Sequence, residues 1–185
     1  RLSQEKKERV MGAISKATSP EYVTSYTNAG IPMSKLKFKV EGGKRAKASG
    51  AKFETKVRED LESKKWIVAK WTNNVDIEVK DNQTFGKLVK CKPKFNPFTK
   101  SLMMNSAGFP DFISFKKIGE ESYDVTGVEV KSSGTLSKIE KQKCHWLLEN
   151  KIFSRILIAK KSKERGKVDY TDFKDRYKKD LIAEQ

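Results

Sequence analysis

Two neighbouring strands are predicted from the stretch Gly108-Phe-Pro-Asp-Phe-Ile-Ser-Phe115 and, after a polar turn, from Tyr123-Asp-Val-Thr-Gly-Val-Glu-Val-Lys131. β-Branched and aromatic residues fill both runs, as is typical of strands. Asp111 lies at the start of the first strand, and Glu129 and Lys131 lie near the end of the second. These three residues are the first candidates for a functional site.

Side chains alternate between the two faces along the second strand, and this alternation sets the direction of Glu129 and Lys131. Residues two apart share a face, so Glu129 and Lys131 point the same way, while Val128 and Val130 point into the opposite layer. Together with Asp111, two carboxylates and an ammonium group would then meet at one edge of a sheet. Such a group can hold a divalent cation beside a phosphodiester.

The chain is strongly basic. Its 185 residues include 40 Lys and Arg against 24 Asp and Glu, which gives a formal net charge of +16. A charge so positive favours a polyanionic partner such as nucleic acid. Because no apolar run approaches the roughly 20 residues that span a bilayer and no signal peptide is recognisable, we expect a cytoplasmic, intracellular protein without membrane contact.

Few residues could serve as soft metal ligands. The two cysteines, Cys91 and Cys144, and the single histidine, His145, are too few for a zinc site of the usual type. We expect both cysteines to be reduced packing residues rather than a disulfide. No small-molecule cofactor is expected.

The pattern predicts three segments along the chain. Residues 1–48 form a basic N-terminal helix and arm, in which an extended strand and a flexible basic loop occupy 35–47. Residues 49–165 form the core. Residues 166–185 form a charged C-terminal helix that packs on the core.

The core is predicted to be an α/β domain with a mixed central β-sheet flanked by helices. Its elements follow in this order: a helix over 49–64, strands over 66–71, 75–80 and 84–91, a loop over 92–107, the two strands described above, a helix over 135–150 and a strand over 152–159. The helix over 135–150 joins two strands that we expect to be parallel, because a crossover connection of this kind links parallel strands.

Two groups of basic residues are candidates for nucleic-acid contact. Loops that mix lysine with aromatic residues suit the rim of a nucleic-acid groove, and lysines on an exposed strand equally discourage aggregation. Both interpretations stay open. The candidates are Lys44, Arg45, Lys47, Lys92, Lys94 and Lys100.

The helix over 49–64 offers two further carboxylates. Its buried stripe is Phe53, Val57 and Leu61, at four-residue spacing. On a helical wheel of about 100° per residue, Glu54 and Asp60 each lie about 60° from the centre of that stripe, on opposite flanks. The wheel alone therefore leaves both as candidates.

Hydrolysis of a phosphodiester at neutral pH needs a cation that takes up charge on the phosphate and lowers the pKa of a bound water. Asp111 and Glu129 are the expected ligands, and the backbone carbonyl of Val130 is available between Glu129 and Lys131. Mg²⁺ keeps several waters, so this number of oxygen ligands suffices. Lys131 would stabilise the developing charge or position the attacking water.

The tripeptide Glu-Val-Lys occurs twice, as Glu129-Val130-Lys131 and as Glu78-Val79-Lys80. What precedes and follows it separates the two copies. Only the copy at 129–131 has an upstream Pro110-Asp111 entering the neighbouring strand and a helix after it. Glu78 and Lys80 are interpreted as an exposed strand face.

The sequence resembles the PD-(D/E)xK nuclease superfamily. The resemblance is carried by Pro110-Asp111, by Glu129-Val130-Lys131 and by the helix opening Gly50-Ala-Lys-Phe-Glu54. Within that superfamily it is most similar to the archaeal Holliday-junction resolvases, which share Lys65-Trp66-x-Val68 and a glutamine at the place of Gln142. The likeness covers about residues 49–160, and the stretch before Asp111 is longer here than in those resolvases.

The resemblance implies a restriction-endonuclease-like fold and a homodimer with two active sites that need Mg²⁺ or Mn²⁺. It favours Glu54 over Asp60, as a catalytic residue and as a third carboxylate at the metal, and it adds Gln142 to the catalytic residues. The implied activity is endonucleolytic cleavage of DNA, with branched or junction DNA as a candidate substrate and an archaeal virus as a candidate source. Two alternatives stay open: a DNA-binding protein of the same fold that does not cut, and a nuclease directed at RNA.

Overall fold

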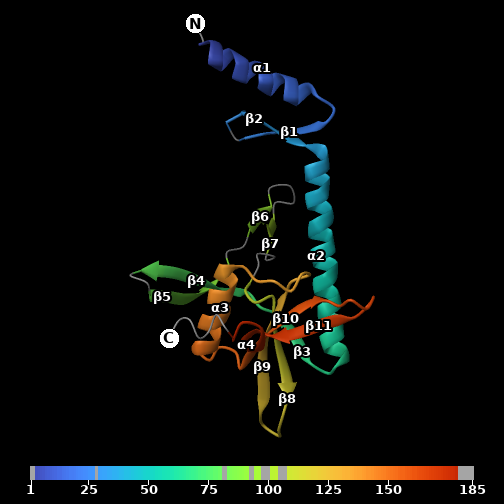
Figure 1. Ribbon diagram of the computed structural model, residues 1–185, viewed down its shortest axis with the longest axis vertical. Helices are drawn as coiled ribbons and strands as arrows, with labels where there is room; N and C mark the ends of the chain where they lie inside the picture. The colour runs from blue at the N-terminus through green and yellow to red at the C-terminus, as the bar shows by residue number, and fades with distance from the viewer. Residues whose placement is uncertain are drawn as a thin grey trace. The chain divides into compact units, whose positions relative to one another are not determined.

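The computed structural model describes residues 3–27, 29–80, 83–91, 94–96, 101–103 and 108–178 of the chain (Figure 1). The chain divides into two compact units, Arg1–Lys52 and Phe53–Gln185. Within the described residues, no helix is both long enough and apolar enough to cross a membrane.

The first unit contains a helix, a hairpin and the beginning of a second helix. Helix α1 (Gln4–Thr18) begins after Ser3, whose side chain accepts a hydrogen bond from the Lys6 amide. This confirms the predicted N-terminal helix. Strands β1 (Tyr22–Tyr26) and β2 (Pro32–Leu36) pair antiparallel.

Helix α2 (Lys37–Ser63) begins twelve residues earlier than predicted. The extended arm therefore ends at Leu36, and the segment expected to be a flexible basic loop is helical, which corrects the prediction. Gly42 and Gly43 each cost about 1 kcal/mol in a helix, but the surrounding Lys, Arg and Ala residues favour one. Adding residues to a helix that is already formed is also easier than starting a new one.

The second unit is built on a mixed five-stranded sheet in the order β11-β10-β9-β8-β3. Strands β9 and β10 are parallel, as predicted from the helix that joins them, and the other neighbours are antiparallel. The α/β class and the mixed sheet are thus confirmed. The bounds are β3 Ile67–Lys70, β8 Phe112–Lys117, β9 Tyr123–Val130, β10 Arg155–Lys161 and β11 Val168–Asp172.

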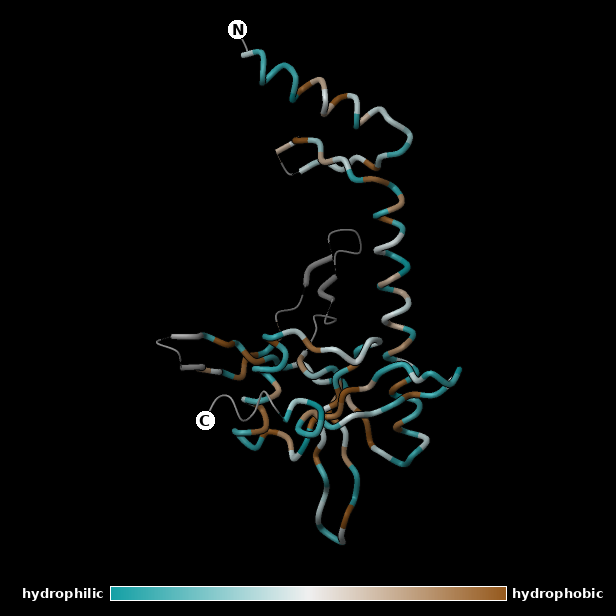
Figure 2. The backbone as a smooth tube through the Cα atoms, in the orientation of Figure 1, coloured by the Kyte–Doolittle hydropathy of each residue, from teal (hydrophilic) through white to brown (hydrophobic). Residues whose placement is uncertain are grey.

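Two apolar clusters cover the two faces of this sheet. On one face, Phe53, Val57 and Leu61 of α2 pack with Val68, Phe112 and Val128, so the predicted stripe of this helix is confirmed. On the other face, helix α3 (Lys138–Glu149) contributes its Cys144 and Leu147 to a cluster with Ile156 and Ile158. The strongly apolar run of β10, which serves both clusters, is visible in Figure 2.

In the described part of the second unit, four strands lie outside the central sheet, in two separate hairpins. Strands β4 (Asn73–Lys80) and β5 (Gln83–Lys90) form one of them, and β6 (Lys94–Asn96) and β7 (Ser101–Met103) form the other. The strands predicted near 75–80 and 84–91 exist. Two short strands replace part of the loop predicted over 92–107.

The C-terminal segment differs from the prediction of one long helix. Its first residues form β11, and helix α4 (Phe173–Arg176) has four residues, with Asp172 as its cap. The charged composition of the segment suggested a helix, but Val168 fills a place in one apolar cluster and Phe173 is fully buried in the other. These tertiary contacts override the helix propensity of the segment. Residues 179–185 lie outside the described part of the chain.

Candidate active site

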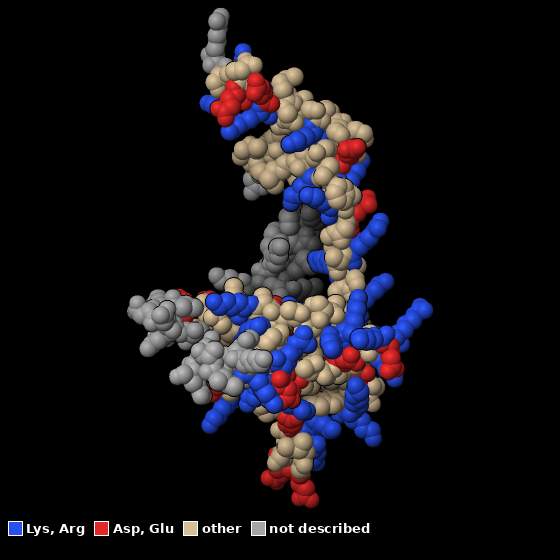
Figure 3. All heavy atoms as spheres, in the orientation of Figure 1, with Lys and Arg blue, Asp and Glu red and all other residues tan. Residues whose placement is uncertain are grey.

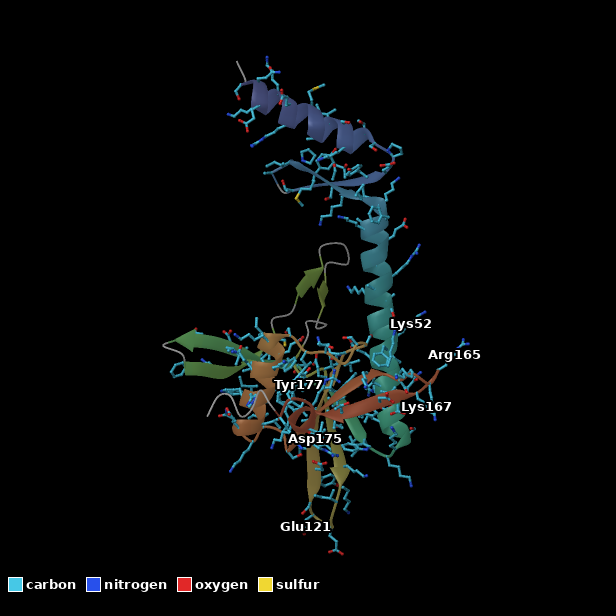
Figure 4. All side chains as sticks on the ribbon, in the orientation of Figure 1. Lys52, Glu121, Arg165, Lys167, Asp175 and Tyr177 are labelled. Carbon is cyan, nitrogen blue, oxygen red and sulfur yellow. The ribbon has the colours of Figure 1, made fainter. Side chains whose placement is uncertain are left out.

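The candidate site lies at one end of the central sheet, where β3 ends, β8 begins and β9 ends. Phe112 pairs with Val128 in the antiparallel register, so the next pair along places Asp111 opposite Glu129. Lys70 pairs with Phe112 at the end of β3. Figure 4 labels Glu121 at the tip of the β8–β9 hairpin, at the other end of these strands from the site.

Two glycines make room for the chain that leads to Asp111. A Cβ on Gly108 would lie 1.9 Å from the carbonyl oxygen of Trp71, and a Cβ on Gly127 would lie 2.9 Å from Cγ of Pro110. The Trp71 amide also donates a hydrogen bond of 3.1 Å to the backbone carbonyl of Asp111. Since neither glycine can gain a side chain without displacing its neighbour, both help to fix the position of Asp111.

The carboxylate of Asp111 is largely buried, with 17% of its side chain exposed. Its Oδ2 accepts a hydrogen bond of 2.9 Å from the amide of Val130. Burial raises the pKa of Asp111, and the charge of Glu54 adds to the rise. The Val130 amide and the nearby ammonium groups of Lys70 and Lys131 oppose it without cancelling it.

Glu129 is the most deeply buried acid of the site, with 4% of the residue exposed. Burial and the neighbouring charge of Asp111 raise its pKa to about 8, against the opposing effect of Lys131. Its Oε1 lies 3.2 Å from Nζ of Lys131. Its Oε2 is buried and has no hydrogen-bond partner in the described structure. A buried acceptor without a partner is costly, which marks this oxygen as a candidate ligand for a cation.

Lys131 shares its ammonium between two acids. Its Nζ lies 2.5 Å from Oε1 of Glu140 as well as 3.2 Å from Glu129. Burial alone would lower the pKa of Lys131, but the bonds to Glu140 and Glu129 outweigh it and raise that pKa. Lys131 is therefore a protonated cation, and its ion pair with Glu140 of α3 fixes its position.

Glu140 belongs to this group although sequence reasoning did not select it. It lies in the first turn of α3, where Ser137 and Glu140 form a reciprocal capping box. The spacing Ser-x-x-Glu at the start of a helix could have revealed the cap. Nothing in the sequence indicates that the same carboxylate reaches Lys131.

Glu54 reaches the site through Lys70. Its Oε2 lies 2.6 Å from Nζ of Lys70, which in turn lies 3.9 Å from Oδ1 of Asp111. The other wheel candidate, Asp60, instead accepts hydrogen bonds from Lys64 and Tyr170, each at 2.7 Å. The structure therefore brings Glu54 to Asp111 and gives Asp60 a different set of partners. No sequence pattern singled out Lys70.

Gln142 is half-buried in α3, two residues after Glu140. Two residues correspond to about 200° around a helix, so its side chain leaves the helix on a different side from Glu140. Within the described part of the chain it forms no hydrogen bond with the acids or with Lys131. Glu78, the acid of the second Glu-Val-Lys copy, is exposed on β4, as predicted.

The donor set suits a hard cation. Mg²⁺ and Mn²⁺ prefer carboxylate oxygens, and Mg²⁺ in proteins often uses only one or two carboxylates together with waters. Asp111 and Glu129, with the unpartnered Oε2, meet that need. Among the residues that the structure describes, no three His, Cys, Asp or Glu side chains are grouped for a metal. The ammonium of Lys70 lies between Glu54 and Asp111, so Glu54 does not join Asp111 and Glu129 as a third grouped acid.

The predicted nucleic-acid contacts are only partly described. Lys44, Arg45 and Lys47 are exposed on α2. Lys92 and Lys100 lie outside the described residues, and Lys94 lies in β6 with its side chain outside them. In the face shown in Figure 3, Lys and Arg predominate over Asp and Glu on the surface of the second unit.

Comparisons with known proteins found no similar protein. No protein-family model matches the chain, and neither a curated protein nor a solved structure matches it.

Proposed function

We propose that this protein is a divalent-metal-dependent endonuclease that hydrolyses phosphodiester bonds in DNA, with a restriction-endonuclease-like arrangement of its site. One observation carries the proposal. Glu129 is buried beside Asp111, its Oε2 has no hydrogen-bond partner among the residues that the structure describes, and its other oxygen is paired with Lys131. A purely structural acid would not be expected to keep a buried oxygen without a partner.

Each residue has a role that follows from its position. Asp111 and Glu129 would hold the cation, which on binding supplies charge neutralisation at the phosphate and a more acidic water. Asp111 is oriented for this by the Val130 amide. Lys131 is fixed by Glu140 and carries a positive charge that can stabilise the negative charge developing on the phosphate.

The substrate class follows from charge. The formal charge of +16 and the exposed basic residues Lys44, Arg45 and Lys47 support a polyanionic substrate. The resemblance to junction resolvases adds branched DNA as the substrate and a homodimer as the active form.

The test is a cleavage assay on duplex, flap and four-way-junction DNA with Mg²⁺ or Mn²⁺. Asp111→Asn and Glu129→Gln should each lower the rate on the order of a thousandfold, because each removes a charged ligand with little change of shape. Glu78→Gln is the matched control and should cleave like the wild type.

Two results would contradict the proposal. Cleavage that survives Asp111→Asn or Glu129→Gln undiminished would exclude these residues from catalysis. Wild-type protein that binds DNA with a steep salt dependence but never cleaves it, with either metal, would identify a binding protein instead. RNA of the same sequence, tested in parallel, separates a DNA-directed enzyme from an RNA-directed one.

A further inference from the structure

Lys70 lies where two carboxylates of the candidate site approach each other. Its Nζ is 2.6 Å from Glu54 and 3.9 Å from Asp111. The charge of Glu54 raises the pKa of Asp111, whereas Lys70 lowers it, so the ammonium offsets a repulsion between the two acids. The arrangement is that of a cation shared by two carboxylates.

A divalent cation held by these carboxylates would need nearly the same position. Mg²⁺ binds carboxylate oxygens at about 2.0–2.1 Å, and Nζ of Lys70 lies 3.9 Å from Oδ1 of Asp111, so a cation bound to this carboxylate would lie close to the ammonium. Two positive charges that close repel each other strongly. Metal and ammonium are therefore competitors for the carboxylate of Asp111.

Lys70 also has room to leave. Its side chain is 46% exposed, and its Nζ lies 4.6 Å from the centre of the ring of the buried Phe112. An ion pair between partly exposed side chains is weak, because water screens the two charges. Displacing the ammonium towards solvent therefore costs little compared with the binding of a divalent cation.

We propose that Lys70 is the resident counter-ion of the metal-free site, which holds Glu54 beside Asp111 and is displaced when a divalent cation binds. The inference rests on the proposed function, because it takes Asp111 to be a metal ligand. It goes beyond that function because it assigns Lys70 two effects: it keeps Glu54 beside Asp111 when no metal is bound, and it lowers the affinity of the site for the metal.

The experiment is calorimetric titration of the full-length protein with Mn²⁺ alone, without nucleic acid. Lys70→Met should bind Mn²⁺ about fivefold more tightly than the wild type, because no ammonium has to be displaced. Lys70→Arg keeps the charge and should bind like the wild type. Lys64→Met is the matched control, since Lys64, directly after α2, pairs with Asp60 at 2.7 Å, and it should leave the affinity unchanged.

Thermal unfolding supplies a second readout. Without metal, Lys70→Met should unfold at a lower temperature than the wild type, because Glu54 and Asp111 lose the cation between them. Addition of Mn²⁺ should raise its unfolding temperature more than that of the wild type. If Lys70→Met does not fold, Lys70→Gln, which can still donate a hydrogen bond to Glu54, carries the same expectation.

The outcomes separate this inference from the proposed function. If the wild type binds no Mn²⁺, or binds it equally well after Asp111→Asn, the metal site itself is wrong. If the wild type binds Mn²⁺ through Asp111 but Lys70→Met binds it equally or more weakly, the metal site stands and the displacement of Lys70 is wrong.

Discussion

The same tripeptide, Glu-Val-Lys, occupies two very different places in this protein. Glu129 lies in β9, between β8 and β10 and beneath α3, with 4% of the residue exposed. Glu78 lies in β4, in a two-stranded hairpin, and is exposed. An acid and a lysine on one strand face therefore have a strongly shifted pKa only where neighbouring strands and a helix remove them from water.

Burial is the physical difference between the two copies. Loss of water around Glu129 disfavours its charged form, and Asp111 adds a second negative charge, so its pKa rises to about 8. Lys131 and its partner Glu140 are positioned around it by α3.

The largest effect should be on the pH dependence of stability. The pKa of Glu129 is about 8 in the folded protein and near 4.5 when unfolded, so the folded state holds the proton more tightly. The stabilising contribution is fully present below pH 4.5 and is lost as the pH rises through 8. In metal-free buffer, Glu129→Gln should reduce the loss of unfolding free energy between pH 5 and pH 9 by about 2 to 4 kcal/mol.

The measurement is urea unfolding at pH 5, 7 and 9 in the presence of a chelator. Glu78→Gln should keep the wild-type pH dependence, because its carboxylate is exposed. A Glu129→Gln variant whose stability falls between pH 5 and pH 9 as steeply as that of the wild type would show that Glu129 is not the group responsible.

A smaller effect should follow from filling the space at two glycines. Gly127 in β9 would place a Cβ 2.9 Å from Pro110, and Gly86 in β5 would place one 2.3 Å from the Trp146 ring. Overpacking of this kind costs about 1 to 3 kcal/mol, so Gly127→Ala and Gly86→Ala should both lower the free energy of unfolding.

Only Gly127→Ala should also reduce DNA cleavage, by about tenfold, because Pro110 precedes Asp111 and a displaced carboxylate loses catalytic geometry. Urea unfolding and the cleavage assay are measured on both variants. Equal cleavage by the two would mean that Asp111 tolerates the displacement of Pro110, and that the close packing at Gly127 serves stability alone.

The smallest effect should come from Glu140. Glu140→Gln removes the negative charge that lies 2.5 Å from Nζ of Lys131, and the cleavage rate should fall by about fivefold to tenfold as that ammonium becomes less well positioned. Ser137→Ala is the control. It removes the side-chain cap at a cost of about 1 kcal/mol in stability but leaves the ion pair in place. If Ser137→Ala slows cleavage as much, Glu140 acts only through the helix cap.

Much of the fold follows from local patterns. The spacing of Phe53, Val57 and Leu61 predicted the buried face of α2, because a helix repeats about every 3.6 residues. Ser3 caps the start of α1, as is typical of a serine directly before a helix. The start of α2 at Lys37 was missed because its glycines indicated a loop, whereas the neighbouring Lys, Arg and Ala residues favour a helix. The strand at Val168–Asp172 was missed because its charge indicated a helix, and tertiary contacts overrode that propensity.

Within the site, local sequence patterns were enough to predict that Asp111 and Glu129 lie at the ends of adjacent strands. They also predicted that Glu129 and Lys131 share a face, because the two-residue period of a strand is local. Only the tertiary structure decided that Lys70 lies between Glu54 and Asp111, and that Glu140 lies beside Lys131. These ion pairs join residues on different strands and helices. No local period connects such residues, so packing alone brings them together.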